Sequence, residues 1–202
     1  MTELQDKRMA GDYEIFQAIS VGIVEIVMGE NPDAEPEERY MCAVCTSNDL
    51  FAQYSDVCVS DDYAEILELY GQRVASEADK LRAELTELKA QGIDDCLITA
   101  KDCTPLSYED DLNGRVVVIK PTVLTREYQR APHQYQLVTG GFGASPPSRG
   151  SACYCTNLYS GKTDRFERRD VLGTVDREDL PEWAKEGLHR IEQAKKRNRE
   201  AR

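Results

Sequence analysis

The side chains with the clearest chemical potential in this sequence are carboxylates, which gather in two runs. The first run consists of Asp33, Glu35, Glu37 and Glu38, and the second of Asp61, Asp62, Glu65 and Glu68. The second run has helical spacing, which would place its charges along one face of a helix. Such surfaces attract basic partners, although an ordinary solvated face has the same composition. Both interpretations are open at this point.

A second group of acidic residues allows a catalytic function as the alternative to a binding role. Asp94, Asp95 and Asp102 flank a possible short strand, Cys96 to Thr99, and Lys101 lies beside them. Carboxylates in this arrangement can hold magnesium, so a small metal-dependent nuclease is the alternative function. The order of residues does not match the usual Pro-Asp then Asp/Glu-x-Lys arrangement of nucleases. We therefore expect no catalytic residue, no metal and no cofactor.

The cysteines raise the question of zinc. Cys42 and Cys45 have the spacing of half a zinc knuckle, and Cys153 with Cys155 could complete four ligands. Both pairs lie in expected strands, where Cys42 and Cys45 would point to opposite faces. Burial as small apolar residues is the expected role. The only histidines, His133 and His189, are expected at the surface.

A glycine-rich loop from Gly140 to Ser151 is the most distinctive loop of the chain. It lacks the Gly-Lys-Ser/Thr ending of a phosphate-binding loop and carries Pro146-Pro147 where a helix would have to begin. It is either a long hairpin loop or a recognition loop. In the second case Phe142 and Arg149 are its anchors, because interfaces favour these residue types. A ligand- or nucleic-acid-binding β module using this loop is a further alternative function.

Charge is distributed unevenly between the halves of the 202-residue chain. The net charge is −12, but residues 1–110 hold 25 acids and 8 bases (−17), and residues 111–202 hold 12 acids and 17 bases (+5). The acidic half would be repelled by nucleic acid. The start of the chain shows no export signal, and no apolar run is long enough for a bilayer. We expect a cytoplasmic, bacterial protein with no membrane contact.

The elements that must position these residues are strands and two helices. Residues 13–46 are rich in β-branched residues interrupted near Ser20-Val21-Gly22 and at Gly29–Asp33, which predicts a hairpin or meander. A helix is predicted over 61–91, with an Asp62-x-x-Glu65 capping box and Gly92 as its stop. Its predicted apolar stripe is Leu67, Tyr70, Val74, Ala78, Leu81, Leu85 and Leu88. At about 45 Å the stripe could pack on its own sheet or partly on a second copy of the chain.

The remainder is predicted to be β-rich and closed by a helix. Strands are expected at 115–120, 134–139, 152–158 and 165–171, and a helix is expected to begin after Asp179, with Pro181 in its first turn. The predicted fold class is therefore α+β: N-terminal strands with one long helix, then a small antiparallel sheet or partial barrel closed by a C-terminal helix. The predicted regions are an acidic α+β region (1–93), a β-rich region (94–178), and a C-terminal helix with a basic, fraying tail (179–202).

Two segments carry a resemblance to other proteins. Residues 40–56 (YMCAVCTSNDLFAQYSD), and the pair Gln136–Ser145 and Arg165–Gly173, resemble small acidic proteins carried by integrative and conjugative elements of gut Firmicutes. The resemblance carries over no activity and no site residue. It implies a setting in which genes help a mobile element to persist, and such elements often encode inhibitors of restriction or CRISPR nucleases.

Composition and this setting together favour a binding role over catalysis. The expected function is a non-enzymatic interaction protein, an acidic DNA-mimic-like inhibitor of a basic nucleic-acid-binding defence protein. Its partner would be a nuclease or a nuclease–nucleic acid complex, with no direct DNA binding by the acidic half. The expected partner-binding residues are the two carboxylate runs together with Phe142 and Arg149.

Overall fold

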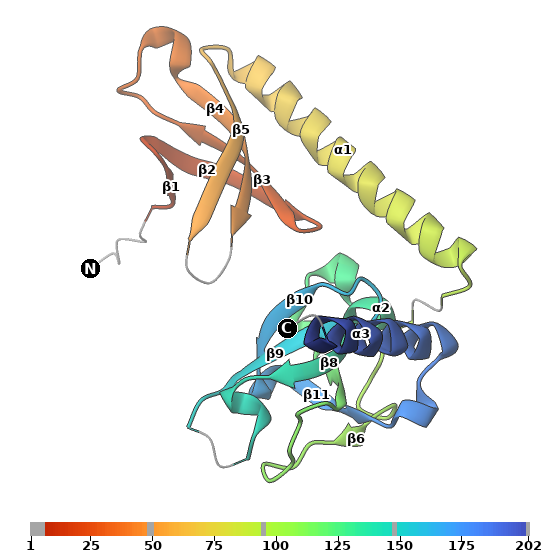
Figure 1. Ribbon diagram of the computed structural model, residues 1–202. Helices are drawn as coiled ribbons and strands as arrows, with labels where there is room; N and C mark the ends of the chain where they lie inside the picture. Colours follow the sequence, from red (N-terminus) through yellow and green to blue (C-terminus); the bar gives the residue numbers. More distant parts are fainter. Residues whose placement is uncertain (1–6, 48–50, 94–95, 147–148, 201–202) are drawn as a thin grey trace. The chain divides into compact units, whose positions relative to one another are not determined.

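A computed structural model describes residues 7–47, 51–93, 96–146 and 149–200 (Figure 1). The chain divides into two compact units, Met1–Thr86 and Glu87–Arg202. Each unit contains one antiparallel sheet and helical segments, so the predicted α+β class is confirmed. The charge asymmetry follows this division. The first unit holds 19 acids and 6 bases, a net charge of −13, and the second holds 18 acids and 19 bases, a net charge of +1.

The first unit is a five-stranded meander in the order β1-β2-β3-β4-β5. Its strands are β1 (Met9–Ala10), β2 (Tyr13–Val21), β3 (Val24–Glu30), β4 (Tyr40–Ser47) and β5 (Ala52–Ser60). The break near Gly22 and the turn after Gly29 occur where the sequence predicts them, and the β3–β4 loop contains a single 3-10 turn, η1 (Pro36–Glu38).

This sheet curls and buries side chains on both of its faces. Met41, Ala43 and Cys45 lie on the concave face, and Ile26, Met28 and Cys42 lie on the opposite face. Arg8, just before β1, donates hydrogen bonds to the Tyr54 hydroxyl on β5 and to the Cys45 sulfur, so the two edges approach each other across the concave face. Bulges in β2 and in the β4–β5 pair provide the extra twist.

Strand β5 is not among the elements predicted from the sequence. Its residues, polar and apolar alike, are mostly exposed, as expected of an edge strand that pairs only with β4. Asp56 adopts a positive φ of 50° at the bulge, which an Asp side chain tolerates better than most.

Helix α1 (Tyr63–Ala90) begins and ends as the sequence predicts, with a modified cap. Asp62 accepts from the Ala64 N–H (2.8 Å), whereas the Asp62 N–H binds the Ser60 hydroxyl, which in turn donates to Glu65 (2.5 Å). The helix ends in a Schellman motif at Gly92 (φ 67°), where the Ile93 N–H binds the Leu88 carbonyl (3.0 Å).

The N-terminal half of α1 packs on the sheet of its own unit. Ile66, Leu69, Tyr70 and Val74 contact the β3–β4 cluster. The predicted stripe is therefore wrong at its first position, because Ile66 is buried and Leu67 is 48% exposed. Ile66 shares the buried face because it precedes Leu69, Tyr70 and Val74 by three, four and eight residues, which is helical spacing.

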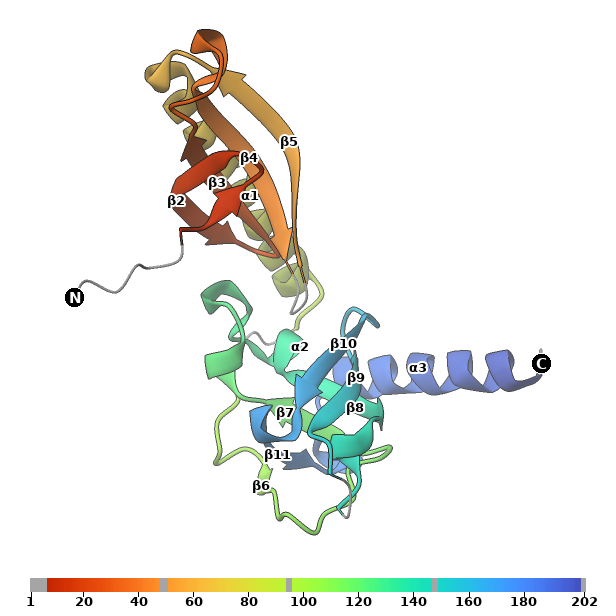
Figure 2. The same ribbon diagram turned by 90° about the vertical axis from the view of Figure 1, so that its left-hand side faces the viewer.

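The second unit is a six-stranded antiparallel sheet in the order β10-β9-β8-β7-β11-β6. The strands are β6 (Thr104–Pro105), β7 (Val116–Ile119), β8 (Tyr135–Gly140), β9 (Ala152–Asn157), β10 (Thr163–Glu167) and β11 (Val171–Val175). The helices are α2 (Ala131–Gln134) and α3 (Glu182–Glu200), with five 3-10 turns at 121–123, 126–128, 142–144, 168–170 and 177–179. Figure 2 shows α3 extending beyond the edge of the sheet.

Both faces of this sheet are covered, which explains why all four residues of β7 are buried. Val116 and Val118 belong to the core beneath α3, and Val117 and Ile119 belong to the core on the opposite face. Helix α3 comes so close to the end of β9 that a Cβ at Gly187 would lie 2.0 Å from the Leu158 carbonyl oxygen. A glycine in this helix is therefore required by packing.

Three local predictions for the second unit differ from the structure. The strand expected at 165–171 is interrupted by the 3-10 turn at Arg168–Asp170, which a Glu167/Asp170 capping box closes. Cys96 to Thr99 is not a strand; instead the buried Gln134 side chain binds the N–H (2.8 Å) and carbonyl (3.0 Å) of Ile98. The C-terminal tail remains helical to Glu200.

Among the described residues, no helix carries an apolar stretch long enough to cross a bilayer.

Candidate functional site

Strand register brings the two acidic runs to one end of the first unit. Tyr40, the first residue of β4, pairs with Glu30 on one side and with Ser60 on the other. The loop at 31–39 and the start of α1 therefore leave the sheet together, and η1 contacts β5 (Figure 1). We call this region the acidic end; its carboxylates are Asp33, Glu35, Glu37, Glu38, Asp61, Asp62, Glu65 and Glu68.

The loop that carries the first run is held in one conformation by contacts to the sheet. The Tyr13 hydroxyl donates to the Glu38 carbonyl (2.6 Å), and the Asn31 N–H donates to the Arg39 carbonyl (2.9 Å). Arg39 also pairs with Glu30 (2.7 Å). Because these contacts use backbone atoms or residues outside the run, the exposed carboxylates of the loop are pre-organised for a partner.

The carboxylates of the acidic end fall into two groups. Asp62, Glu65 and Glu68 hydrogen-bond to groups within the unit: Asp62 and Glu65 complete the helix cap, and Glu68 accepts from Gln72 (3.1 Å). Within the part of the chain that the structure describes, the other five side chains form no ion pair and are exposed: Asp33, Glu35, Glu37, Glu38 and Asp61.

One carboxylate of the acidic end, Glu38, contributes to a shift in the pKa of the neighbouring Tyr13. The pKa of Tyr13 is raised, first by burial and then by the charges of Glu38 and Asp12. A negative potential of this kind disfavours the tyrosinate anion and favours cations near the loop. The smaller, electrostatic part of this pKa shift has the sign that a surface for a basic partner requires.

An aromatic cluster lies beside the acids. The Tyr63 ring is 5.4 Å from the Tyr40 ring and 6.3 Å from the Phe16 ring. Phe16 and Tyr63 are 46% and 45% exposed, and the exposed Leu67 follows one helical turn after Tyr63. The acidic end thus combines a partly exposed aromatic cluster with carboxylates beside it. Aromatic side chains next to charged ones are typical of protein-binding surfaces.

The two remaining predicted binding residues lie in the second unit. Phe142 begins the 3-10 turn of the β8–β9 loop and is 76% exposed, and Arg149 is exposed in the same loop. The turn lies against the start of β9, because a Cβ at Gly143 would be 2.1 Å from the Ser151 carbonyl oxygen. The loop joins two antiparallel strands, as a hairpin loop does.

The alternative of a metal-dependent nuclease depends on three aspartates, of which the structure describes only Asp102. Asp94 and Asp95 lie outside the described residues. Asp102 accepts hydrogen bonds from the Thr99 N–H (2.8 Å) and hydroxyl (2.7 Å), which hold the pKa of its carboxyl below the usual value. Its carboxylate thus closes a local turn. Among the described residues, no three His, Cys, Asp or Glu side chains are grouped to hold a metal ion.

His133 is half-buried, contrary to the surface position expected from the sequence. Its ring lies 4.3 Å from the Tyr128 ring. Burial, helped by the charge of Arg130, lowers the pKa of His133 to about 4. The imidazole is therefore neutral at physiological pH. His189 is exposed on α3, as expected.

The cysteines lie in the sheets as strand geometry predicts. Cys42 and Cys45 point to opposite faces of the first sheet, and Cys153 and Cys155 share one buried face of the second. Burial raises the pKa of the Cys155 thiol to about 12, which keeps it protonated.

Phe16, Tyr40 and Tyr63 are the surface residues that sequence reasoning misses. Tyr63 follows directly after the Asp61-Asp62 pair, which is the one local signal for its position. Phe16 and Tyr40 come from separate strands, so their shared contact with Tyr63 depends on the bulge in β2 and on the pairing register.

Comparison with known proteins gives no further assignment: no protein-family model, curated protein or solved structure matches the chain.

Proposed function

We propose that this chain is a non-enzymatic interaction protein whose acidic end docks on a basic, nucleic-acid-binding protein. The observation that carries the proposal is the convergence of two separate acidic runs at the end of the sheet that also carries a half-exposed aromatic cluster. The exposed carboxylates would steer a basic surface into contact. Phe16, Tyr63 and Leu67 would then provide the apolar contact from which most interface energy comes.

The proposed class of partner is a restriction or CRISPR nuclease, or the complex of such a nuclease with nucleic acid. Its DNA-binding surface carries lysine and arginine to neutralise phosphates, and the acidic end would occupy that surface in place of DNA. A net charge of −13 on the first unit supports this choice, because the same charge repels nucleic acid itself.

The test compares single variants of the full chain in a pull-down from bacterial lysate and in plasmid cleavage by restriction and Cas9 nucleases. Glu35→Lys reverses the charge of a carboxylate that forms no ion pair among the described residues, and Phe16→Ala removes one ring of the aromatic cluster. Each should weaken capture and inhibition about tenfold, the loss that corresponds to about 1.4 kcal/mol. Capture by the unmodified chain should also fall when salt is raised.

Two matched controls locate the effect. Asp79→Lys makes the same charge change 16 residues after Tyr63 on α1, about 24 Å along the helix. Asp79 is exposed, and its ion pair with Arg82 lies at the surface, where such pairs contribute little. Ile23→Ala removes a 73% exposed side chain from the β2–β3 turn at the opposite end of the sheet. Both controls should behave like the unmodified chain. Equal losses in the controls and the test variants, or no nuclease inhibited at low salt, would overturn the proposal.

A further inference from the structure

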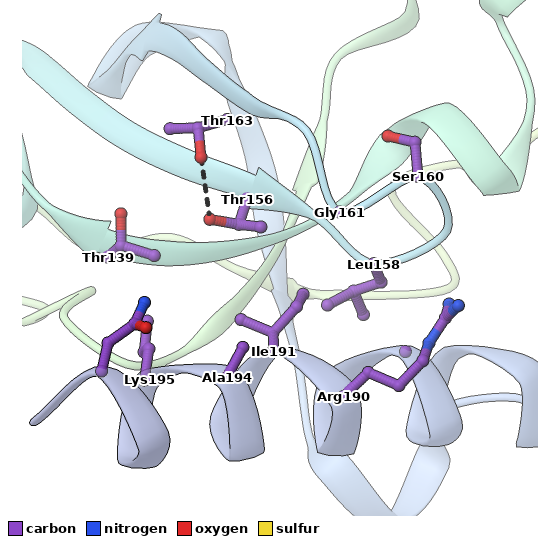
Figure 3. A pocket seen from close by; sticks show the side chains of 12 residues that line it. Thr139, Thr156, Leu158, Ser160, Gly161, Thr163, Arg190, Ile191, Ala194 and Lys195 are labelled. Carbon is purple, nitrogen blue, oxygen red and sulfur yellow. Dashed lines mark hydrogen bonds between the residues drawn. The ribbon is translucent and has the colours of Figure 1, made fainter. Parts of the chain in front are cut away.

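The second unit contains a groove between helix α3 and the β8–β9–β10 edge of its sheet, with a volume of about 530 Å³ (Figure 3). One wall consists of strand and turn residues, among them Thr139, Thr156 and Thr163. The other wall is the C-terminal half of α3. The groove is independent of the acidic end, since every residue that lines it belongs to the second unit.

The strand wall presents hydroxyl groups because the α3 face of the sheet changes from apolar to polar. Near the start of α3 this face carries Tyr135, Leu137 and Leu158, which are buried against the helix. Farther along the strands the same face carries Thr139, Thr156 and Thr163, and the Thr156 and Thr163 hydroxyls lie 3.5 Å apart. Figure 3 shows these hydroxyls on the strand side of the groove.

The helix wall is cationic. Arg190 and Lys195 project from α3 on either side of Ile191 and Ala194 (Figure 3). Among the residues that the structure describes, no aspartate or glutamate lines the groove, although the full chain contains 37 acidic residues. A groove with polar hydroxyl groups on one wall, cations on the other and an apolar floor favours an anionic ligand that also has an apolar part.

The same face of the sheet continues past the groove to an exposed aromatic residue. Tyr154 lies two residues before Thr156 on β9 and is 49% exposed. It pairs with Gly140 on one side, which has no side chain to cover the ring, and with Arg165 on the other. An aromatic ring beside cationic residues is the usual platform on which proteins stack the bases of single strands.

We propose that this face of the second unit binds single-stranded nucleic acid. The phosphates lie in the groove, where Lys195 and Arg190 neutralise them; one guanidinium N–H of Arg190 already donates to the Tyr159 carbonyl (3.2 Å) and fixes the side chain at the groove. The Thr156 and Thr163 hydroxyls bond to each other, which leaves one proton of the pair for a phosphate oxygen. The Thr139 hydroxyl instead donates to the Tyr154 carbonyl (3.1 Å). A base stacks on Tyr154. Single-stranded rather than duplex nucleic acid is the ligand because stacking requires an unpaired, accessible base face.

The test is fluorescence anisotropy of a labelled 15-nucleotide oligo(dT) with the full chain at low salt, together with the matching duplex and with AMP as competitor. Lys195→Glu should weaken binding about tenfold and reduce the salt slope by about 0.7, the value for one single-strand phosphate contact. Tyr154→Ala should weaken binding about tenfold, the loss of one stacked base, without changing that slope.

Lys196→Glu is the matched control, because it makes the same charge change one residue along α3 from a position that does not line the groove. It should lower affinity by less than about twofold. Trp183 fluorescence verifies that each variant is folded, since Trp183 packs in the core of this unit. Equal affinity for duplex, displacement by AMP at the affinity of the oligonucleotide, equal effects of Lys195→Glu and Lys196→Glu, or no binding would each overturn the proposal. These outcomes leave the docking role of the first unit untouched.

Discussion

Replacement of Gly187 by alanine should destabilise the second unit, although alanine is normally favoured over glycine in a helix interior. In an ordinary helix interior, Gly→Ala stabilises by about 1 kcal/mol. In α3 the added Cβ would lie 2.0 Å from the Leu158 carbonyl oxygen, whereas ordinary contacts begin at 3.4 Å. The helix would therefore have to move by about 1.4 Å away from β9.

This movement would loosen the contacts that Ala184 and Leu188 make in the core beneath α3. Overpacking of a core costs about 1–3 kcal/mol, and displacement of a whole helix face favours the upper part of that range. After subtraction of the helix-propensity gain, we expect a net loss of about 2 kcal/mol for Gly187→Ala.

Urea unfolding followed by Trp183 fluorescence is the appropriate assay. Trp183 is the single tryptophan of the chain and packs against this core, so its signal reports on the second unit alone. Gly71→Ala in α1 is the control, because nothing lies within 4 Å of its added Cβ. That variant should be more stable by about 0.5–1 kcal/mol, measured by circular dichroism. A Gly187→Ala variant as stable as the unmodified chain would refute the reasoning.

Two further predictions concern protonation. The pKa of His133 is about 4 in the folded chain, against an ordinary value of 6.5. Between these two pH values the unfolded chain binds one proton that the folded chain does not, so the free energy of unfolding falls as the pH is lowered. Between about pH 7.5 and about pH 5 the loss should be about 2 kcal/mol; His133→Gln should remove it in the Trp183 assay, and an unchanged pH dependence would contradict the assignment. The second prediction concerns the cysteines: iodoacetamide at about pH 8 should first modify Cys58 and Cys96, which are exposed. Cys155 is buried and its pKa is raised to about 12, so it should react only when the chain unfolds. Mass spectrometry of timed samples measures this order, and equal rates for Cys58 and Cys155 would count against it.

Local signals in the sequence predict the elements with strong patterns. The β-branched residues of 13–28, the Asp62 cap and the Gly92 stop determine strands and helix ends through short-range chemistry. Strand β5 is missed because an exposed edge strand has no buried face, so its polar residues show no pattern that a loop would not also show.

Long-range contacts account for the remaining differences. The segment around Ile98 satisfies its backbone through the side chain of Gln134, 36 residues away, so it needs no strand partner. Arg168 turns away from a continuous strand to donate to the carbonyls of Gly143 and Asp110. Neither pairing leaves a signal in the neighbouring sequence.

The candidate site shows the same division between local and long-range information. Both acidic runs are evident from composition, but their convergence depends on the pairing of Tyr40 with Ser60. The aromatic cluster depends on the bulge near Phe16, and the hydroxyl groove on the register between β9 and β10. A composition-based interpretation could therefore identify the charge and not the aromatic cluster beside it.

The most direct test of the docking role is zero-length carbodiimide cross-linking of the full chain in bacterial lysate, followed by mass spectrometry. The reagent joins a carboxylate to a lysine that it already contacts, so it identifies the surface as well as the partner. We predict cross-links from Asp33, Glu35, Glu37 and Asp61 to lysines of a nucleic-acid-binding protein, lost at high salt. Cross-links spread equally over exposed carboxylates such as Asp79 and Glu186, or formed only with acidic proteins, would contradict the account.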